Sequence, residues 1–272
     1  MKDYQVFKNN GNWYKGNLHS HTTVSDGKMT PEQSVEVYKE HGYNFLALSE
    51  HDIYTDYRKQ YNTDNFIMIP AIEASAILYQ EEGSSKRLEI HHLHGILGTS
   101  EMQKNAKAPL FTHMEHVPPQ KHYGTWRGRE ISQEIADMLR DRGCVVTYNH
   151  PIWSRVTEEE FIYTEGVQAL EIFNYNTVLE SNTGYDVTYW DRMLRMGKKI
   201  NGFASDDNHN EGLFEDSCGG WICVQAPELT HDAIIQNFLD GNYYSSAGPV
   251  IKDWGIKDGK AWISCSPVNH IN

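Results

Sequence analysis

Histidine and acidic side chains occur in short clusters along the sequence, and their types suit metal binding. The chain has 14 histidines in 272 residues, which is well above ordinary usage. Imidazole and carboxylate groups are the ligands that suit Zn, Mn or Fe. A metal site is therefore the kind of functional site that this composition favours most. The residues that stand out, in chain order, are His19, His21, Asp26, Glu50-His51-Asp52, Glu73, His92, His94, Asn149-His150 and Asp206-Asp207-Asn208-His209.

These clusters fall at or near the ends of predicted strands. Side chains alternate along an extended chain, so the rings of His19 and His21 are expected on one side. Glu171 departs from the pattern, because it precedes the end of its strand by two residues. In barrels and doubly wound sheets alike, function sits at the carboxyl ends of strands. After a first strand that ends near residue 18, apolar runs predict strands at residues 45–49, 66–72, 88–97, 144–148, 169–173 and 200–204.

Helical segments alternate with these strands. Thr30 predicts a helix N-cap, with Pro31 at the first helical position and Gln33 three residues after the cap. Further helices are predicted at residues 131–142, 187–196 and 231–239. The alternation predicts an α/β fold with parallel strands and right-handed crossovers. Seven or so strand–helix units in residues 1–245 fit a barrel better than an open sheet.

Two stretches depart from the alternation. The segment 100–128 is polar and contains Pro118-Pro119 with three histidines, His113, His116 and His122. Loops of this length in compact domains are usually functional or mobile. Beyond Tyr243 the sequence becomes Gly-rich and β-like, with one expected hairpin before Asn272. We therefore expect a main domain at residues 1–245 and a small β-rich extension at residues 246–272.

Charge and composition exclude several classes of protein. There are 24 Lys and Arg against 37 Asp and Glu, a formal charge of −13, which argues against broad nucleic-acid binding. The four cysteines are too few for a disulfide scaffold, and we expect Cys218 and Cys223 to be reduced and buried. No apolar run approaches the roughly 18 residues of a membrane span, and the N-terminus has no signal-peptide core. We therefore expect no membrane partner and a cytoplasmic location.

Four segments carry a resemblance to a known family. Residues 17–27 and 45–52 resemble the first two motifs of the PHP (polymerase and histidinol phosphatase) family, and residues 204–209 resemble its last motif. Residues 243–249 resemble a segment of the CehA/McbA-like branch, which is related to carbamate-ester hydrolases. The similarity covers about residues 16–250. It implies a distorted (β/α)7 TIM-like barrel with two to three divalent metals, Zn, Mn or Fe, at its C-terminal face.

The resemblance also implies the metal ligands. Where many family members have histidine, this chain has Asp26, which favours a harder or more weakly held ion in the third site. By position, the implied ligands are His19, His21, Glu73 and Asp207 for the first metal, Glu73, His150 and one of His92 and His94 for the second, and Asp26, His51 and His209 for the third.

Two of these assignments stay open. His92 and His94 both point inward in a regular strand, with His91 pointing away, and we favour His92 as the ligand. Asp206 and Asp207 also compete, and the two-residue spacing to His209 favours Asp207. Ligating imidazoles usually donate their other N–H to a carboxylate or carbonyl, a role for which the candidates are Asp52, Glu171 and Asn149.

These features predict a metal-dependent hydrolase. A metal-bridging hydroxide would attack phosphorus or a carbonyl carbon, because bound water has its pKa lowered towards 7. The expected substrate is a small phosphorylated metabolite. A carboxylic or carbamate ester and a non-catalytic metal-binding module are the alternatives. The residues predicted to act in catalysis are Glu73, Asp207, His209 and Asp52, and those predicted to bind substrate are Arg155, Asn149, Arg127 and Arg129, with Trp126, Trp153, Tyr123 and Tyr175 as candidate pocket walls.

Overall fold

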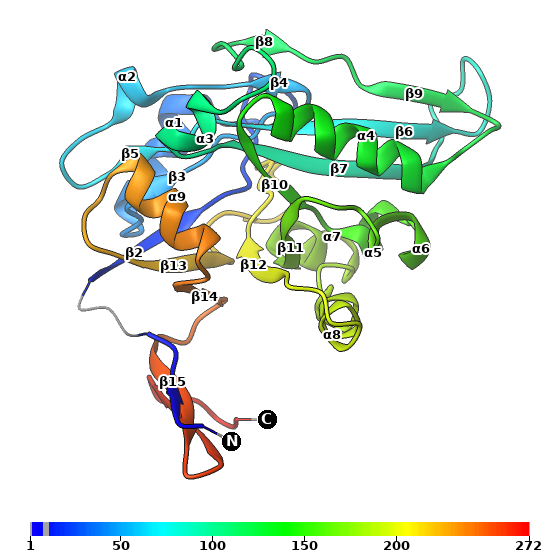
Figure 1. Cartoon of the computed structure of the whole chain (residues 1–272). Coiled ribbons are helices and arrows are strands. Elements are labelled where there is room, and N and C mark those ends of the chain that lie inside the picture. The colour runs from blue at the N-terminus through cyan, green and yellow to red at the C-terminus, as the bar shows by residue number, and fades with distance from the viewer. Residues whose placement is uncertain (1, 8–10, 272) are drawn as a thin grey trace.

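Two sheets lie at the centre of the computed structural model, which describes residues 2–7 and 11–271 (Figure 1). The larger sheet has the order β12-β11-β10-β7-β6-β9, and the second has the order β14-β13-β2-β3-β5. The strands of the larger sheet are β6 (Ala71–Tyr79), β7 (Arg87–Leu97), β9 (Gln120–Tyr123), β10 (Cys144–Tyr148), β11 (Val167–Asn174) and β12 (Asn201–Ser205). Those of the second are β2 (Asn12–Asn17), β3 (Phe45–Leu46), β5 (Ile67–Met68), β13 (Trp221–Ala226) and β14 (Tyr243–Ser246).

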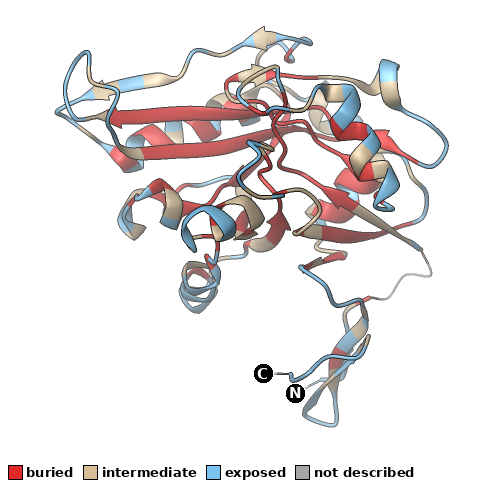
Figure 2. Cartoon of the chain, turned by 180° about the vertical axis from the view of Figure 1, so that it is seen from behind, coloured by how far each residue is buried: buried red, intermediate tan, exposed pale blue. Residues whose placement is uncertain are grey.

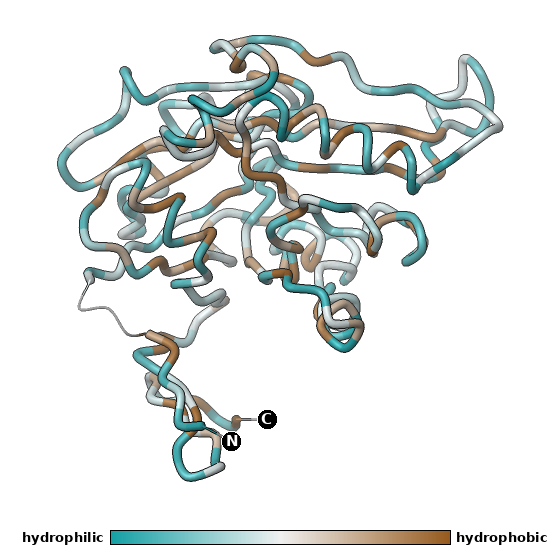
Figure 3. Tube along the Cα trace, in the orientation of Figure 1, coloured by the Kyte–Doolittle hydropathy of each residue, from teal (hydrophilic) through white to brown (hydrophobic). Residues whose placement is uncertain are grey.

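Helices cover these sheets and confirm a mixed α/β fold. The N-terminus of α1 has the predicted capping box between Thr30 and Gln33. Helix α4 turns Ile131, Ile135 and Leu139 towards β7 and β10, so apolar and polar residues alternate along it in Figure 3. The helices are α1 (Pro31–Glu40), α2 (Arg58–Tyr61), α3 (Ser100–Lys104), α4 (Gly128–Asp141), α5 (Pro151–Ser154), α6 (Glu158–Phe161), α7 (Tyr175–Ser181), α8 (Val187–Arg195) and α9 (His231–Leu239).

Strand direction is the main correction to the sequence-based prediction. Strand β7 runs antiparallel to both β6 and β10, and β13 runs antiparallel to both β2 and β14. The predicted strand 66–72 is two strands, β5 and β6, which Ile69 and Pro70 separate. Strand β6 then continues to Tyr79 and turns back into β7 through a polar segment with Gly83 at φ +82°. Parallel pairing was expected for β6, β7 and β10 because this hairpin was not recognised.

The two sheets approach each other where β2, β3 and β12 end and β6 begins. Isolated parallel bridges join Ser20 to Asn208 and His51 to Glu73. The backbone N–H of Asp207 donates to the carbonyl of His19 at 2.9 Å, and that of Asp52 donates to the carbonyl of Glu73 at 2.8 Å. The strands of the body form two main sheets in the described residues, so the closed (β/α)7 barrel stays a prediction. The bridges nevertheless bring the carboxyl ends of β2 and β12 close to the first residues of β6.

A third, small sheet stands apart from the body. It has the order β1-β15-β16, with β1 at Tyr4–Gln5, β15 at Ile251–Lys257 and β16 at Lys260–Cys265. Figure 2 shows that most of this sheet is exposed, whereas the long strands of the body are buried. The hairpin β15–β16 agrees with the expected C-terminal hairpin. The pairing of β1 with β15 was not predicted, and the division at residue 245 stays a prediction.

The segment 100–128 has more structure than expected. It contains α3, β8 (Glu115–His116) and β9, and β8 pairs with β4 (Ile53–Tyr54). His113 accepts a hydrogen bond at Nδ1 from the backbone N–H of Asp56 at 3.1 Å, and His122 packs 5.3 Å from the Trp126 ring. All four cysteines are free, although Cys218 is half-buried where we expected it buried. Among the described residues, no helix combines the length and apolar character that crossing a bilayer would require.

A buried carboxylate holds the ends of α1 and β12 to the following loop. Asp206 accepts hydrogen bonds from the backbone N–H groups of Cys218, Gly219 and Gly220 at 2.7–2.8 Å, and from the Tyr38 hydroxyl at 2.7 Å. Burial raises the pKa of Asp206 to about 7, although these hydrogen bonds act in the opposite direction. Because its oxygens are occupied by these donors, Asp206 has a structural role here.

We expect the substitution Tyr38→Phe to destabilise the protein by about 1–3 kcal/mol, the usual cost of leaving a buried polar partner unsatisfied. The loss would be measured as the free energy of unfolding in urea. The exposed Tyr185 offers a control, because Tyr185→Phe removes a hydroxyl from a side chain that is 52% exposed. Equal stability of the two variants would contradict a structural role for this network.

Candidate metal centre

Four buried side chains meet where β2 and β12 end and β6 begins. They are His19, His21, Glu73 and Asp207, and each offers a ligand atom within 4.8 Å of the others. The Nε2 atom of His19 lies 3.1 Å from Glu73 Oε1 and 2.9 Å from Asp207 Oδ1. The Nε2 atom of His21 also lies 2.9 Å from Asp207 Oδ1. We call these four residues the central cluster.

Glu73 has a central position in this arrangement. Its Oε1 faces His19, and also lies 3.4 Å from both His92 Nδ1 and His150 Nε2. Its Oε2 lies 2.9 Å from His51 Nδ1. The two oxygens of one carboxylate therefore face different sets of imidazole nitrogens, which is the arrangement that a ligand bridging two cations requires.

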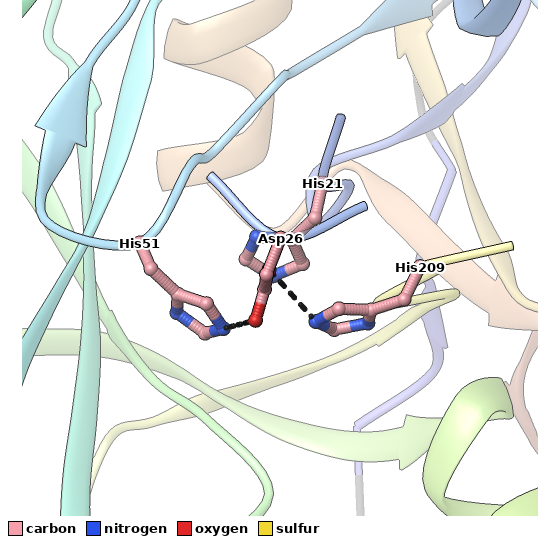
Figure 4. Close-up of side chains that lie close together, drawn as sticks. All are labelled: His21, Asp26, His51 and His209. Carbon is pink, nitrogen blue, oxygen red and sulfur yellow. Dashed lines mark ion pairs between the residues drawn. The ribbon is translucent and has the colours of Figure 1, made fainter. Parts of the chain in front are cut away.

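A second, more exposed group adjoins the central cluster. Asp26, His51 and His209 lie around His21, as Figure 4 shows. Asp26 Oδ2 lies 3.5 Å from His51 Nε2, and Asp26 Oδ1 lies 3.3 Å from His209 Nε2. The side chains of Asp26, His51 and His209 are 54%, 24% and 17% exposed. We call these three residues together with His21 the outer group.

The structure separates the two open alternatives on β7. His92 joins His51 and Glu73 in a candidate metal group, whereas His94 belongs to none of the groups found among the described residues. The His94 ring lies behind His19, with 4.2 Å between ring centroids, and its Nδ1 is 3.3 Å from Thr147 Oγ1. This geometry favours His92 as the ligand and places His94 against the back of the cluster.

Several polar residues orient the candidate ligands. Glu171 Oε1 lies 2.8 Å from His19 Nδ1, and Glu171 Oε2 accepts the backbone N–H of His150 at 3.0 Å. A donor hydrogen on His19 Nδ1 leaves its Nε2 lone pair free for a cation. The Asn174 side chain donates to Glu171 at 3.0 Å and to Asp207 at 2.9 Å. Sequence reasoning missed Asn174, although its position at the end of a predicted strand was a usable signal.

Two residues predicted to act in catalysis or substrate binding have supporting positions instead. Asn149, predicted to bind substrate, is fully buried and donates to Glu73 Oε1 at 2.7 Å. Asp52, predicted to act in catalysis, accepts the backbone N–H of Ser75 at 2.8 Å and belongs to none of the candidate metal groups in the described chain. Both side chains fix the position of β6, and through it Glu73.

Unusual backbone conformations occur at three site residues. Asp52, His150 and Asp207 have φ values of +57°, +26° and +55°. Such left-handed conformations cost free energy for residues other than glycine and concentrate at functional sites. They turn the chain sharply just after a strand, so that the side chain faces its neighbours across the strand ends.

The donor set fits divalent cations. Three buried atoms, His51 Nδ1, Glu73 Oε2 and Asp207 Oδ1, have no hydrogen-bond partner within the described residues. Although His51 Nδ1 and Glu73 Oε2 lie only 2.9 Å apart, they do not form a hydrogen bond with each other. Buried polar atoms are almost always paired, so the orphaned nitrogen and oxygens point to a ligand between them. Nitrogen and carboxylate donors together suit Zn, Mn or Fe.

Three of the four residues in the central cluster have the protonation state that metal binding requires. Burial, together with the neighbouring His51 and His209, lowers the pKa of His21 to about 3. Burial acts to raise the pKa of Glu73 and Asp207, but adjacent histidines, His19 first among them, hold both well below the usual range. His21 is therefore neutral and the two carboxylates are ionised at neutral pH, which are the forms that ligate metals. Burial lowers the pKa of His19, but Asp207, Glu73 and Glu171 raise it well above its usual value, so binding of a metal there would release a proton.

A cavity of about 200 Å³ opens above these groups. Of the residues predicted to bind substrate or line a pocket, Trp153 lines it. Arg155 instead donates to the backbone carbonyl of Arg87 at 2.9 Å, and the Arg129 guanidinium lies 4.8 Å from the Tyr163 ring centroid. Arg127 immediately precedes α4. In the described chain the cavity is lined by Asp26, His51, Arg87, His92, His150, Trp153, Asn176, Glu180, Asp207, His209, Glu211, Leu213, Phe214 and Asp216.

We expect the outer group to release its metal first. Its carboxylate is more than half exposed, whereas the ligand candidates of the central cluster are almost completely buried. Titration of metal-loaded protein with a mild chelator, followed by elemental analysis, should remove one equivalent before the rest. In Asp26→His that equivalent should be retained at higher chelator concentration. The surface variant His116→Ala serves as control, and loss of all equivalents in one step in wild type would contradict the expectation.

Comparisons with known proteins agree with the fold. No protein-family model and no curated protein sequence matches the chain. Among solved structures, a two-domain protein from Bacteroides vulgatus that contains a predicted PHP-like metal-dependent phosphoesterase is 14% identical, with a TM-score of 0.51 over 90% of this chain and 69% of that one. A candidate metal-dependent phosphoesterase from Bifidobacterium adolescentis is 14% identical, with a TM-score of 0.47 over 83% of this chain and 95% of that one. An amidohydrolase from Chromobacterium violaceum with bound sulfate and no metal is 13% identical, with a TM-score of 0.47 over 84% of this chain and 97% of that one. The chain therefore shares the mixed α/β fold of the PHP-like protein.

Proposed function

We propose that this protein is a metal-dependent hydrolase, and specifically a phosphoesterase that acts on a small phosphorylated metabolite. The observation that carries the proposal is the position of Glu73, whose two carboxylate oxygens face separate sets of histidines beneath an open cavity. Paired cations held by one carboxylate are typical of enzymes that displace a group from phosphorus. The formal charge of −13 argues against a nucleic-acid substrate.

The proposed ligand sets follow the family resemblance, whereas the candidate groups in the structure join His92 with His51 and Glu73, and His150 with His19 and Glu171. The four residues of the central cluster would hold one cation, and Glu73 would share a second with His92 and His150. Asp26, His51 and His209 would hold a third. When bound, such cations lower the pKa of a coordinated water and neutralise charge that develops on the reacting group. Zn, Mn and Fe are the proposed metals, because the donors combine imidazole with carboxylate.

The residues of the chain would then position the reacting groups. His209 lines the cavity and its ring is oriented by a hydrogen bond from Nδ1 to the backbone carbonyl of Asp207 at 2.8 Å. Asp207 supplies negative charge at the cavity lining, and Glu73 supplies it from a buried position beside Asp207. Asn149, Glu171 and Asn174 donate to or accept from these ligands and so hold them in place.

A carboxylic or carbamate ester hydrolase with the same site is the second candidate function. The observation that favours it is the charge of the cavity lining. Phosphate usually needs a cation besides the metals, and Arg87 is the one Lys or Arg that lines the cavity among the described residues. The three arginines predicted for this role lie elsewhere. The likeness of residues 243–249 to the carbamate-ester branch supports the same alternative. The open cavity argues against a third candidate, a non-catalytic metal-binding module.

A hydrolysis screen tests the proposal. The protein is stripped of metal, reconstituted separately with Mn, Zn and Fe, and assayed on phosphate monoesters, phosphate diesters and aryl esters. We expect turnover of monoesters, and loss of that turnover in the double variant His19→Ala/Glu73→Ala. Turnover of esters but not phosphates would move the assignment to the second candidate. Activity that survives in the metal-stripped double variant would refute both.

A second test addresses the carboxylate behind His19. We expect Glu171→Gln to lower metal affinity by about 10–100-fold, because such supporting carboxylates fix the tautomer and raise the basicity of the imidazole. Affinity would be measured by competition with a chelator of known strength. Glu165→Gln, at an exposed position, is the matched control. Unchanged affinity in Glu171→Gln would show that His19 does not depend on this contact.

A further inference from the structure

We propose that the cavity selects esters whose leaving group is uncharged and apolar, and that it disfavours a leaving group with a second anionic charge. The inference rests on the proposed hydrolase function and deepens it, because it concerns the part of the substrate that does not reach the metal ligands. Three features of the cavity support it: one aromatic wall, one apolar loop tip and the sign of the remaining charges.

The aromatic wall is Trp153, which follows directly from the strand end that carries His150. Its ring centroid lies 5.1 Å from that of His150 and 6.1 Å from that of His92. Its indole N–H donates to Glu180 Oε2 at 2.6 Å, so the ring is held in a fixed orientation at the cavity wall. A group attached to a reacting atom above these histidines would therefore lie against the indole. Indole rings offer a large, rigid apolar surface with a polar N–H at one edge.

The loop between β12 and β13 forms another part of the cavity lining. Leu213 and Phe214 line the cavity from this loop, and Leu213 is 82% exposed. The base of the loop is fixed, because Asp216 accepts the backbone N–H groups of His209 at 2.7 Å and Asn210 at 3.1 Å. An exposed leucine at the tip of an anchored loop beside a cavity offers apolar area that a bound group can cover.

The charges that are not ligand candidates are mostly negative. Glu180, Glu211 and Asp216 line the cavity, whereas Arg87 is the one basic side chain among the described lining residues. The Arg87 backbone also anchors Arg155, which lies outside this cavity. A second phosphate or carboxylate on the leaving group would meet like charges on this side. The cations proposed below the cavity would attract only the reacting anionic group.

The experiment compares substrates that differ in the leaving group and little in intrinsic reactivity. Metal-reconstituted protein is assayed with benzyl phosphate, ethyl phosphate and fructose 1,6-bisphosphate. If the protein hydrolyses carboxylic esters and not phosphates, benzyl acetate and ethyl acetate are compared instead. We expect KM for the benzyl compound to be about tenfold lower than for the ethyl compound, a ratio usual for added apolar area in a pocket. The bisphosphate should be the poorest phosphate substrate.

Variants test whether Trp153 and Leu213 cause the preference for the benzyl compound over the ethyl compound. Trp153→Ala and Leu213→Ser should each reduce the benzyl-to-ethyl preference severalfold, with metal content unchanged by elemental analysis. Trp254→Ala and Leu194→Ser are matched controls at exposed positions away from the cavity, and they should keep the wild-type preference. Glu211→Lys should improve turnover of the bisphosphate relative to benzyl phosphate.

The outcomes separate this inference from the proposed function. Turnover with equal KM for benzyl and ethyl compounds, or a preference for the bisphosphate, would overturn the inference and leave the hydrolase proposal standing. If no ester is turned over, the hydrolase proposal fails, and the inference is decided by calorimetry. Tighter binding of benzylphosphonate than of ethylphosphonate to the metal-loaded protein would support it, and equal binding would overturn it.

Discussion

The buried carboxylate of Glu73 is the feature on which the rest of the site depends. A fully buried carboxylate is costly unless charged or hydrogen-bonding partners surround it. Here Asn149 donates to one of its oxygens and imidazoles face both. Those imidazoles come from separate segments that only the folded chain brings together. The cost of removing this charge from water is therefore offset only when the ends of several strands meet, which couples the fold to the site.

The layers around Glu73 have different roles. The central cluster is almost completely buried, with His19 and Asp207 held by contacts to Glu171 and Asn174. The outer group is partly exposed and faces the cavity. Asp206 fixes the chain next to Asp207 without joining either set, since four donors occupy its oxygens. Of these two adjacent aspartates, Asp206 therefore holds the backbone and Asp207 offers the candidate ligand atom.

Sequence reasoning located the four longest helices, α1, α4, α8 and α9, and the convergence of chemistry-bearing residues, because both leave local signals. Capping at Thr30 and the apolar period of residues 131–142 depend on neighbours in the chain, and both helices are present. The antiparallel setting of β7 was not predicted, because the turn between β6 and β7 was not recognised as a hairpin and the pairing of β7 with β10 joins segments far apart in the sequence. The contacts that Arg155 makes with Arg87 and Asn149 makes with Glu73 are tertiary as well, so they could not be predicted from local sequence, and their role in substrate binding stays a prediction.

The small terminal sheet constrains the order of folding. Gln5 of β1 pairs with Gly255 of β15, so two segments separated by nearly the whole chain must meet. Closing so long a loop from an unfolded chain carries a large entropic cost, and non-local strand pairing is slow. Once the body has folded, β2 and β14 flank the same strand, β13, and this brings the two flanking segments close together. The terminal sheet is then assembled from partners that are already near each other, so we expect it to form late, after the body has folded.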